Sequence, residues 1–156
     1  MANFTSIYES PLGTLVMTSN GVSLIQLDFA KANIEYETTN ALLVFDEAKR
    51  WLDIYFSGTK PNFYPQIELH GTAFQKKVWG EILKIDFGQA VSYGELARRL
   101  CCRSSQAVGQ AVSRNPILIM VPCHRIIAAD GKIGGFSAGI DKKVWLLKHE
   151  GQVIGG

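Results

Sequence analysis

The stretch SYGELARRLCCRSSQAVGQAVSRNP, residues 92–116, decides how the second half of the chain is interpreted. Ser92 is suited to cap a helix over residues 93–100, because its hydroxyl can accept a backbone N–H of the first turn. A polar turn follows over residues 101–104, and a second helix over residues 105–114 ends at Asn115-Pro116. Two short helices joined by a tight turn indicate a helix-turn-helix. A helical hairpin that binds nothing is the alternative.

The second of these helices is slim. Ala107, Gly109 and Ala111 give it small side chains. Its backbone could therefore approach another surface closely, either a neighbouring helix or a groove of nucleic acid. Helical spacing alone does not decide between the two.

Arginine is concentrated in the same region. The net charge of the whole chain is only +2, yet five of its six arginines fall within residues 93–125, with Glu95 as the single acid: Arg98, Arg99, Arg103, Arg114 and Arg125. Arginine matches phosphate with a bidentate fork and stacks on bases. The cluster indicates an anionic polymer as partner, although a solvated helix face is the ordinary interpretation of such a charge cluster.

The first 70 residues have a different character. Apolar runs at residues 4–8, 13–18 and 22–29, separated by turn signals at Ser10-Pro11 and Asn20-Gly21, predict three strands. Residues 41–56 have helical periodicity, and residues 60–69 look like a linker. We expect an α/β protein of the α+β kind, with domains at residues 1–70 and 71–156.

The rest of the second domain is predicted from local signals. Thr72 is suited to cap a further helix. The apolar run at residues 117–121 is about strand length, and residues 126–133 suggest a small hairpin around Asp130-Gly131. A glycine-rich loop follows at residues 134–139. Asp141 is suited to cap a last helix that Gly151 stops.

Composition excludes several classes of protein. The chain of 156 residues is 47% hydrophobic, so it can form a core, but no apolar run reaches the ~18 residues of a membrane span. The first ten residues lack the pattern of a signal peptide. Three cysteines, two of them adjacent, argue against a disulfide framework and for a cytoplasmic protein with reduced thiols. Three scattered histidines and no C-x-x-C pattern predict no metal site, and no glycine-rich phosphate loop or other signal predicts a cofactor.

Pro122-Cys123-His124-Arg125 is the candidate reactive segment. A thiolate is a strong soft nucleophile, and neighbouring cations favour it over the thiol. Adjacent side chains point in different directions, so a water molecule would be the natural relay from Cys123 to His124. A buried, inert cysteine is the alternative.

Taken in order, the motifs resemble a known family. The match comprises Gly71-Thr72-Ala73-Phe74-Gln75, Val78-Trp79, Ser92-Tyr93, Ala107-Val108-Gly109, Asn115-Pro116, Val121-Pro122-Cys123-His124-Arg125-Ile126, Gly134-Gly135-Phe136-Ser137-Ala138-Gly139, Lys143 to Leu147 and His149-Glu150-Gly151. It resembles the methylated-DNA–protein-cysteine methyltransferases, also called O6-alkylguanine-DNA alkyltransferases. The resemblance covers residues 71–151 closely and residues 1–70 loosely. It implies a small ribonuclease-H-like lobe of sheet and helix, packed on a mostly helical domain with a helix-turn-helix.

The resemblance also implies a reaction. The alkyl group of O6-alkylguanine, or of O4-methylthymine, in duplex DNA would pass irreversibly and stoichiometrically to Cys123. His124 would accept the thiol proton through water, Glu150 would orient His124, and Asn115 would brace the turn that presents the cysteine. Tyr93 would press on the target phosphate, help to flip the base and then serve the purine ring. We expect a monomer that needs no membrane.

Further residues acquire roles by the same resemblance. The slim helix would enter the minor groove, and the expected DNA contacts are Tyr93, Gly94, Arg103, Ser104, Ser105, Gln106, Ala107, Gly109, Arg114 and Arg125. The glycine-rich loop at residues 134–139 would line the guanine pocket, and the expected lining residues are Tyr93, Pro122, Ile126, Phe136, Ser137 and Ala138.

Three features depart from the family pattern. Gln106 stands where an intruding arginine is usual, which predicts weaker DNA binding unless Arg103 substitutes for it. The turn before it is shortened and lacks the usual Gly-x-Pro. Phe136 replaces a common tyrosine and Ala138 a common glycine, which predicts a tighter pocket that accepts methyl better than benzyl.

Three other classes of function stay open as alternatives. A lesion-recognition protein without transfer would lack the acceptor cysteine, whereas Cys123 is present. A thiol-based regulator would need a second DNA-binding or activation region, which the chain lacks. A cysteine hydrolase would not need the arginine-rich helical hairpin.

Overall fold

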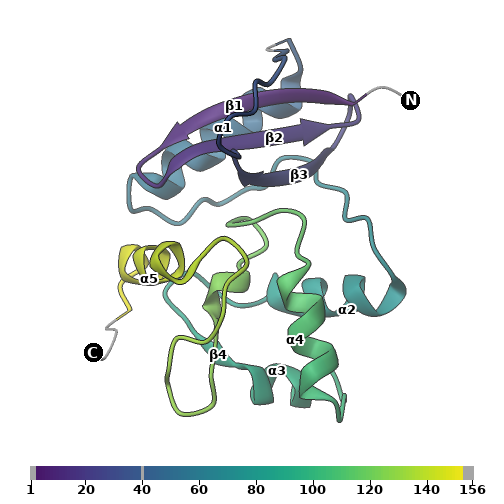
Figure 1. The fold of residues 1–156 in the computed structure, drawn as a ribbon, viewed down its shortest axis with the longest axis vertical. Helices are drawn as coiled ribbons and strands as arrows, with labels where there is room; N and C mark the ends of the chain where they lie inside the picture. Colours follow the sequence, from purple (N-terminus) through teal and green to yellow (C-terminus); the bar gives the residue numbers. More distant parts are fainter. Residues whose placement is uncertain (1–2, 40, 153–156) are drawn as a thin grey trace. The chain divides into compact units, whose positions relative to one another are not determined.

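The structure, a computed structural model, describes residues 3–39 and 41–152. The chain forms two compact units, residues 1–70 and residues 71–156, which Figure 1 colours from purple to teal and from teal to yellow. The predicted mixture of a small sheet-and-helix unit and a mostly helical unit is confirmed.

The first unit is built on a three-stranded antiparallel sheet in the order β1-β2-β3. The strands are β1 (Phe4–Ser10), β2 (Gly13–Ser19) and β3 (Leu24–Phe29). β3 begins two residues later than the apolar run at 22–29 predicts. The Asn20 side chain accepts the N–H groups of Val22 and Ser23, at 3.1 and 2.9 Å, and this holds both residues in a turn.

Helix α1 (Leu43–Phe56) packs on this sheet and contacts all three strands, and Figure 1 shows it lying along one sheet face. Its buried side chains recur at helical spacing: Val44, Phe45, Ala48, Trp51, Leu52 and Tyr55. Leu15, Met17, Leu24 and Leu27 complete the core from the strands. The linker adds one parallel bridge, Ile67 beside Leu24.

The second unit contains helices α2 (Ala73–Ile82), α3 (Tyr93–Arg99), α4 (Ser105–Ser113) and α5 (Ile140–His149). Two short strands, β4 (Val91–Ser92) and β5 (Ile126–Ile127), pair in parallel. Thr72, Ser92 and Ser104 cap α2, α3 and α4 through their hydroxyl groups. The buried indole N–H of Trp79 donates to the Ala111 carbonyl at 2.8 Å and thereby ties α2 to α4.

The turn between α3 and α4 is formed by backbone hydrogen bonds. The Cys101 N–H donates to Arg98 O at 3.0 Å, and the Cys102 N–H donates to Ala97 O at 2.9 Å. Cys101 has a φ of 53°, in the left-handed region that glycine usually supplies at this position of a helix end. The pattern ends α3 and redirects the chain into α4 although the usual glycine is missing.

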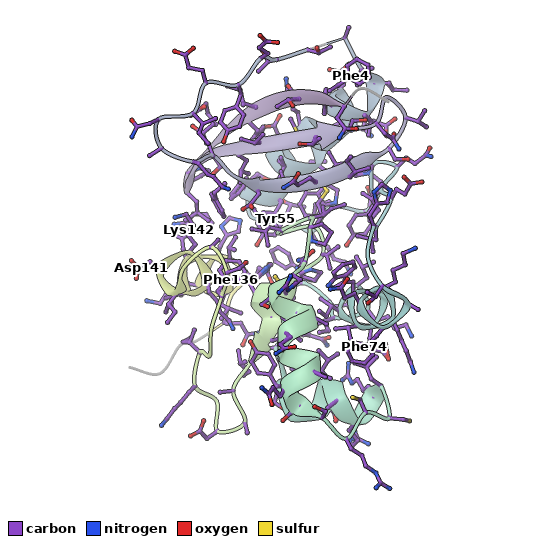
Figure 2. The ribbon with its side chains drawn as sticks, turned by 45° about the vertical axis from the view of Figure 1, so that its right-hand side comes forward. Phe4, Tyr55, Phe74, Phe136, Asp141 and Lys142 are labelled. Atoms are coloured by element: carbon purple, nitrogen blue, oxygen red, sulfur yellow. The ribbon has the colours of Figure 1, made fainter. Side chains whose placement is uncertain are left out.

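Three local expectations differ from the structure. The run at 117–121 is buried but turns on itself, with Val121 N–H donating to Ile117 O and Ile119 at a φ of 71°. Residues 126–133 keep a turn at their far end, whereas Ile126 pairs with Val91 of β4 instead of a hairpin partner. Asp141 does not cap α5, because the helix already begins at Ile140 after Gly139. Figure 2 shows Asp141 on the outer side of that helix.

Candidate active site

Cys123 opens a short 3-10 helix, η1 (Cys123–Arg125). The chain before it is held by the buried Asn115, whose amide donates to Val121 O at 2.7 Å and whose carbonyl accepts the Ile117 N–H at 3.0 Å. One side chain therefore closes the loop on both sides of the strained Ile119. Losing it would leave buried backbone groups unsatisfied, at a cost of about 1–3 kcal/mol each.

His124 and Glu150 form a buried pair. His124 Nε2 lies 2.6 Å from Glu150 Oε2, and both side chains are fully buried. An ionised carboxylate only accepts hydrogen bonds, so Nε2 carries the proton and Nδ1 keeps its lone pair. Nδ1 has no hydrogen-bond partner among the described residues. Burial lowers the pKa of His124 in spite of the carboxylate beside it, so the ring is a neutral base near pH 7.

Glu150 is also held by Arg125. The guanidinium donates from Nε to Oε1 at 2.7 Å and from Nη2 to Oε2 at 3.1 Å, and from Nη1 to the Ile85 carbonyl at 2.6 Å. Burial alone would raise the pKa of Glu150, but its contacts with His124 and Arg125 outweigh burial and hold the pKa at about 2. The expectation that Arg125 contacts DNA is not supported. Its side chain is buried and committed to these acceptors, and we do not propose it as a phosphate ligand.

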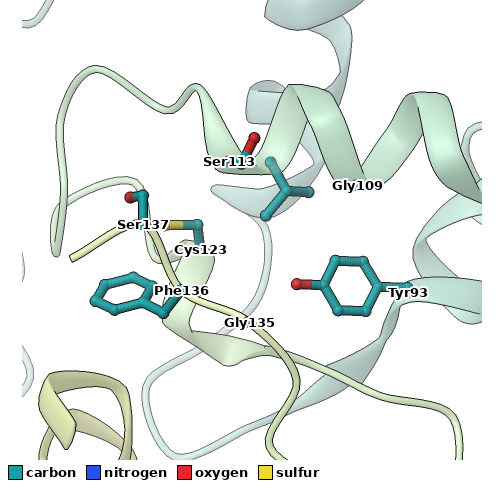
Figure 3. A pocket seen from close by; sticks show the side chains of 8 residues that line it. Tyr93, Gly109, Ser113, Cys123, Gly135, Phe136 and Ser137 are labelled. Carbon is teal, nitrogen blue, oxygen red and sulfur yellow. The ribbon is translucent and has the colours of Figure 1, made fainter. Parts of the chain in front are cut away.

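A cavity of about 350 Å³ lies over Cys123. Figure 3 shows the Tyr93 hydroxyl pointing into it, with Cys123, Phe136 and Ser137 on the other side. Burial, reinforced by charge at Cys123, raises the pKa of Tyr93. The hydroxyl therefore stays protonated and can donate a hydrogen bond to a bound ring.

The lining of the cavity matches the expected set in part. Tyr93, Phe136 and Ser137 line it, whereas Pro122, Ile126 and Ala138 do not. Pro122 and Ile126 are buried, and Ile126 is paired in the sheet with β4. Gly135, in the glycine-rich loop that was expected to line the pocket, also lines it, and the lining residues that the sequence did not indicate are Val112 and Ser113. Val112 and Ser113 lie three and four residues after Gly109, on one face of α4, and that spacing is the signal that could have identified them.

Lys143 is the other residue that sequence reasoning did not single out. Its ammonium donates to Ile126 O at 2.5 Å and to Gly135 O at 2.9 Å, which fixes the loop that forms the pocket wall. Burial lowers its pKa to about 8, an effect that charge at Cys123 opposes. Its spacing from the buried Leu146 and Leu147 on α5 was the available signal that this lysine faces inward.

The close approach of the wall depends on glycine. Gly134 has a φ of 74°, and a Cβ there would lie 3.3 Å from Tyr93 Cε2. A side chain at this position would therefore press on the aromatic ring that faces the pocket.

The remaining expected DNA contacts lie on α3, α4 and the turn between them. Most are exposed: Gly94, Arg103, Ser104, Ser105, Gln106 and Arg114. Ala107 and Gly109 are half-buried on α4. Arg98 and Arg99 both form ion pairs with Glu95, so Arg103 and Arg114 are the exposed arginines that these pairs leave available.

Comparison with known proteins identifies the family. Residues 73–152 match the model of the 6-O-methylguanine DNA methyltransferase DNA-binding domain, and residues 3–69 match the ribonuclease-like domain of the same proteins. The chain belongs to the O6-methylguanine DNA methyltransferase family. The resemblance stated from the motifs is thereby confirmed, and in the first unit it covers residues 3–69.

Members of the family match over nearly their whole lengths. The methylated-DNA–protein-cysteine methyltransferase of Methanosarcina acetivorans is 39% identical over 95% of this chain and 98% of its own. That of Mycobacterium leprae is 39% identical over 91% of this chain and 88% of its own. No helix among the described residues is long and apolar enough to cross a membrane.

Solved structures of O6-methylguanine methyltransferases share the fold. The crystal structure of the Mycobacterium tuberculosis O6-methylguanine methyltransferase superposes with a TM-score of 0.86 at 35% identity, covering 96% of this chain and 93% of that one. A structure of the Mycobacterium tuberculosis protein in complex with DNA gives a TM-score of 0.83 at 37% identity, covering 95% and 91%.

Proposed function

We propose that this protein repairs alkylated guanine in duplex DNA by transferring the alkyl group from O6 to the sulfur of Cys123, once per molecule. The observation that carries the proposal is the position of Cys123. It lines a cavity and directly precedes a histidine that is held by a buried carboxylate. Membership of the methyltransferase family supplies the substrate class.

The chemistry follows from the buried pair. His124 Nδ1 takes the thiol proton of Cys123 through a bridging water, and Glu150 stabilises the imidazolium that forms. The thiolate sulfur attacks the alkyl carbon, the S–C bond forms, and the C–O6 bond breaks with its electron pair leaving on guanine. A proton equivalent to the one taken by His124 restores neutral guanine. The thioether formed on Cys123 is not cleaved in this site, so each protein molecule reacts only once and the reaction is stoichiometric.

Tyr93 and Ser137 place the base in the cavity. The protonated Tyr93 hydroxyl donates to the purine ring and offsets the charge that guanine acquires. Ser137, on the opposite wall, supplies a second polar group. A methylated thymine is smaller than guanine, and we include O4-methylthymine as a substrate.

The helix-turn-helix of α3 and α4 delivers the base. Guanine O6 cannot be reached in a stacked duplex, so the nucleotide must be flipped out. The small Ala107 and Gly109 let α4 approach the minor groove, Gln106 fills the gap in the stack, and Arg103 and Arg114 contact phosphate. Gly94, Ser104 and Ser105 complete the contact from the start of each helix. We propose that the protein acts as a monomer in the cytoplasm.

A label-transfer experiment tests the proposal. Duplex DNA carrying O6-methylguanine labelled in the methyl group is incubated with the wild-type protein, Cys123→Ser and Cys102→Ser. We expect label on the wild type and on Cys102→Ser but not on Cys123→Ser. Label on Cys123→Ser, or label remaining on DNA with wild type, would overturn the assignment.

A further inference from the structure

Arg125 is buried beside the candidate relay. Only 7% of the residue is exposed, and its guanidinium donates to both oxygens of Glu150 and to the Ile85 carbonyl. Glu150 Oε2 is shared, because it also accepts from His124 Nε2. His124 and Arg125 therefore bind one buried carboxylate from two sides.

The charge balance of this cluster decides what His124 can do. A buried carboxylate next to an imidazole favours the imidazolium, which cannot take a proton from a thiol. A guanidinium on the same carboxylate neutralises its charge and repels a second cation. Two other charged groups interact with His124: the Glu150 carboxylate and the Lys143 ammonium on α5, which is also a cation. Cys123 precedes His124 in η1.

We propose that Arg125 is a positioning residue, which fixes the Glu150 carboxylate and balances its charge so that His124 rests as a neutral base. This inference rests on the proposed function for its kinetic consequence, but the charge state of His124 can be measured without it. Arg125 touches neither the cavity nor, in the proposed mechanism, the substrate.

A merely structural role is the competing explanation, because Arg125 also links η1 to the carbonyl of Ile85. The two explanations differ in their response to pH. Loss of a structural tie lowers the transfer rate equally at every pH. Loss of the charge balance makes His124 easier to protonate, so it moves the acid limb of the rate profile to higher pH.

Two substitutions separate charge from hydrogen bonding. Arg125→Gln keeps donors near Glu150 but removes the charge, and Arg125→Lys keeps the charge but loses the fork. Arg50→Gln is the matched control, because Arg50 is an exposed arginine on α1, in the other unit. The single-turnover transfer rate to O6-methylguanine duplex is measured for each variant from pH 5 to pH 9.

A second measurement reads His124 directly. The imidazole of His124 is titrated by NMR without DNA in a Cys123→Ser background, so that no thiol titrates beside it. The chain has three histidines, and His70→Gln and His149→Gln identify the other two signals.

We expect the Arg125→Gln acid limb and His124 titration to move to higher pH by about one unit. Arg125→Lys should stay within a few tenths of a unit of wild type at a reduced rate, and Arg50→Gln should match wild type. Unchanged limb and titration in Arg125→Gln would overturn the proposal. If that variant does not fold, Arg125→Met, which also removes the charge, is titrated in its place: an upward shift of about one unit would support the proposal, and an unchanged titration would overturn it. Absence of methyl transfer in wild type would contradict the proposed function and leave the NMR titration as the test of Arg125.

Discussion

His124 Nε2 and Glu150 Oε2 lie 2.6 Å apart with both side chains fully buried, although 26 positions separate them in the chain. Asn115 fixes the loop that leads to η1, and Arg125 fixes the carboxylate. Nδ1 of His124 therefore keeps its lone pair, with no hydrogen-bond partner among the described residues. His124 directly follows Cys123 in the chain.

Removing the negative charge of Glu150 tests this pair. Glu150→Gln can still contact His124 but cannot stabilise an imidazolium, so we expect the transfer rate to fall by roughly 10²-fold or more, as loss of acid–base assistance does. Single-turnover kinetics with an O6-methylguanine duplex measure this. Glu68→Gln, an exposed acid in the first unit, is the control. A rate within twofold of wild type would contradict the role of Glu150.

Glu150 also predicts how acid affects folding. Its pKa of about 2 in the folded protein lies below the ordinary glutamate value of 4.5, so its stabilising contribution is present above about pH 4.5. That contribution is lost as pH falls towards about 2. Chemical denaturation from pH 6 to pH 2 should show a loss of stability in wild type that is smaller in Glu150→Gln. An identical pH dependence in both proteins would count against the assignment.

Lys143 predicts an alkaline limit on transfer. Its pKa of about 8 means that its charge disappears as pH rises through about 8, which weakens its hold on Gly135 and removes a cation that interacts with Cys123. Transfer should therefore decline above about pH 8. Because the pKa is lower in the folded than in the unfolded state, stability rises between about pH 8 and 10.5, and the decline is not unfolding.

The Lys143 prediction has a control on the same helix. Lys143→Met should lower the rate and abolish the step near pH 8, whereas Lys148→Met, at an exposed position of α5, should keep it. A wild-type rate that stays constant from pH 7 to pH 9.5 would refute it.

Gln106 predicts the strength of DNA binding. Gln106→Arg adds a charge and a stacking plane at the start of α4, so we expect affinity for a lesion duplex to rise by roughly tenfold at low salt. Fluorescence anisotropy measures this, and Gln110→Arg, on the same helix, controls for charge alone. If Arg103 substitutes for the usual arginine, Arg103→Gln should weaken binding and Gln106→Arg should restore it. If Gln106→Arg does not raise DNA affinity in either background, the prediction that Gln106 weakens DNA binding is wrong.

Phe136 predicts which adducts fit. It lines the cavity, whereas Ala138 does not, so of these two departures from the family pattern only Phe136 can narrow the pocket directly. We expect transfer from O6-benzylguanine in duplex DNA to be at least tenfold slower than from O6-methylguanine in the same duplex, and Phe136→Ala to raise the benzyl rate. Phe74→Ala, outside this cavity, is the control. Equal benzyl and methyl rates in wild type would refute the restriction.

Local signals in the sequence predicted most of the elements, because they act within a few residues. Thr72 and Ser92 cap helices, as predicted, and Ser104, which was expected only as part of a polar turn, caps α4. The parallel pairing of β4 with β5 could not be predicted, because it joins two-residue strands that are distant in sequence. Nor could an apolar run reveal that residues 117–121 turn.

The site shows the same division. The order of motifs led to Cys123, His124 and Glu150, but the sequence does not say which charges are buried. Arg125 belongs to an arginine cluster that resembles a phosphate-binding surface, and only the fold shows that it faces Glu150. Lys143 is likewise one of several lysines in the sequence, and only the structure shows that its side chain on α5 is buried and donates to the Ile126 carbonyl.

Alkyl transfer to Cys123 is best tested by intact mass spectrometry after incubation with an O6-methylguanine duplex. We expect a gain of one methyl group per chain, mapped to Cys123, that saturates at one equivalent of lesion and is absent in Cys123→Ser. An unmodified chain that nevertheless binds the lesion tightly would contradict transfer and indicate a recognition protein. A methyl group mapped to Cys101 or Cys102 would contradict the assignment of the acceptor.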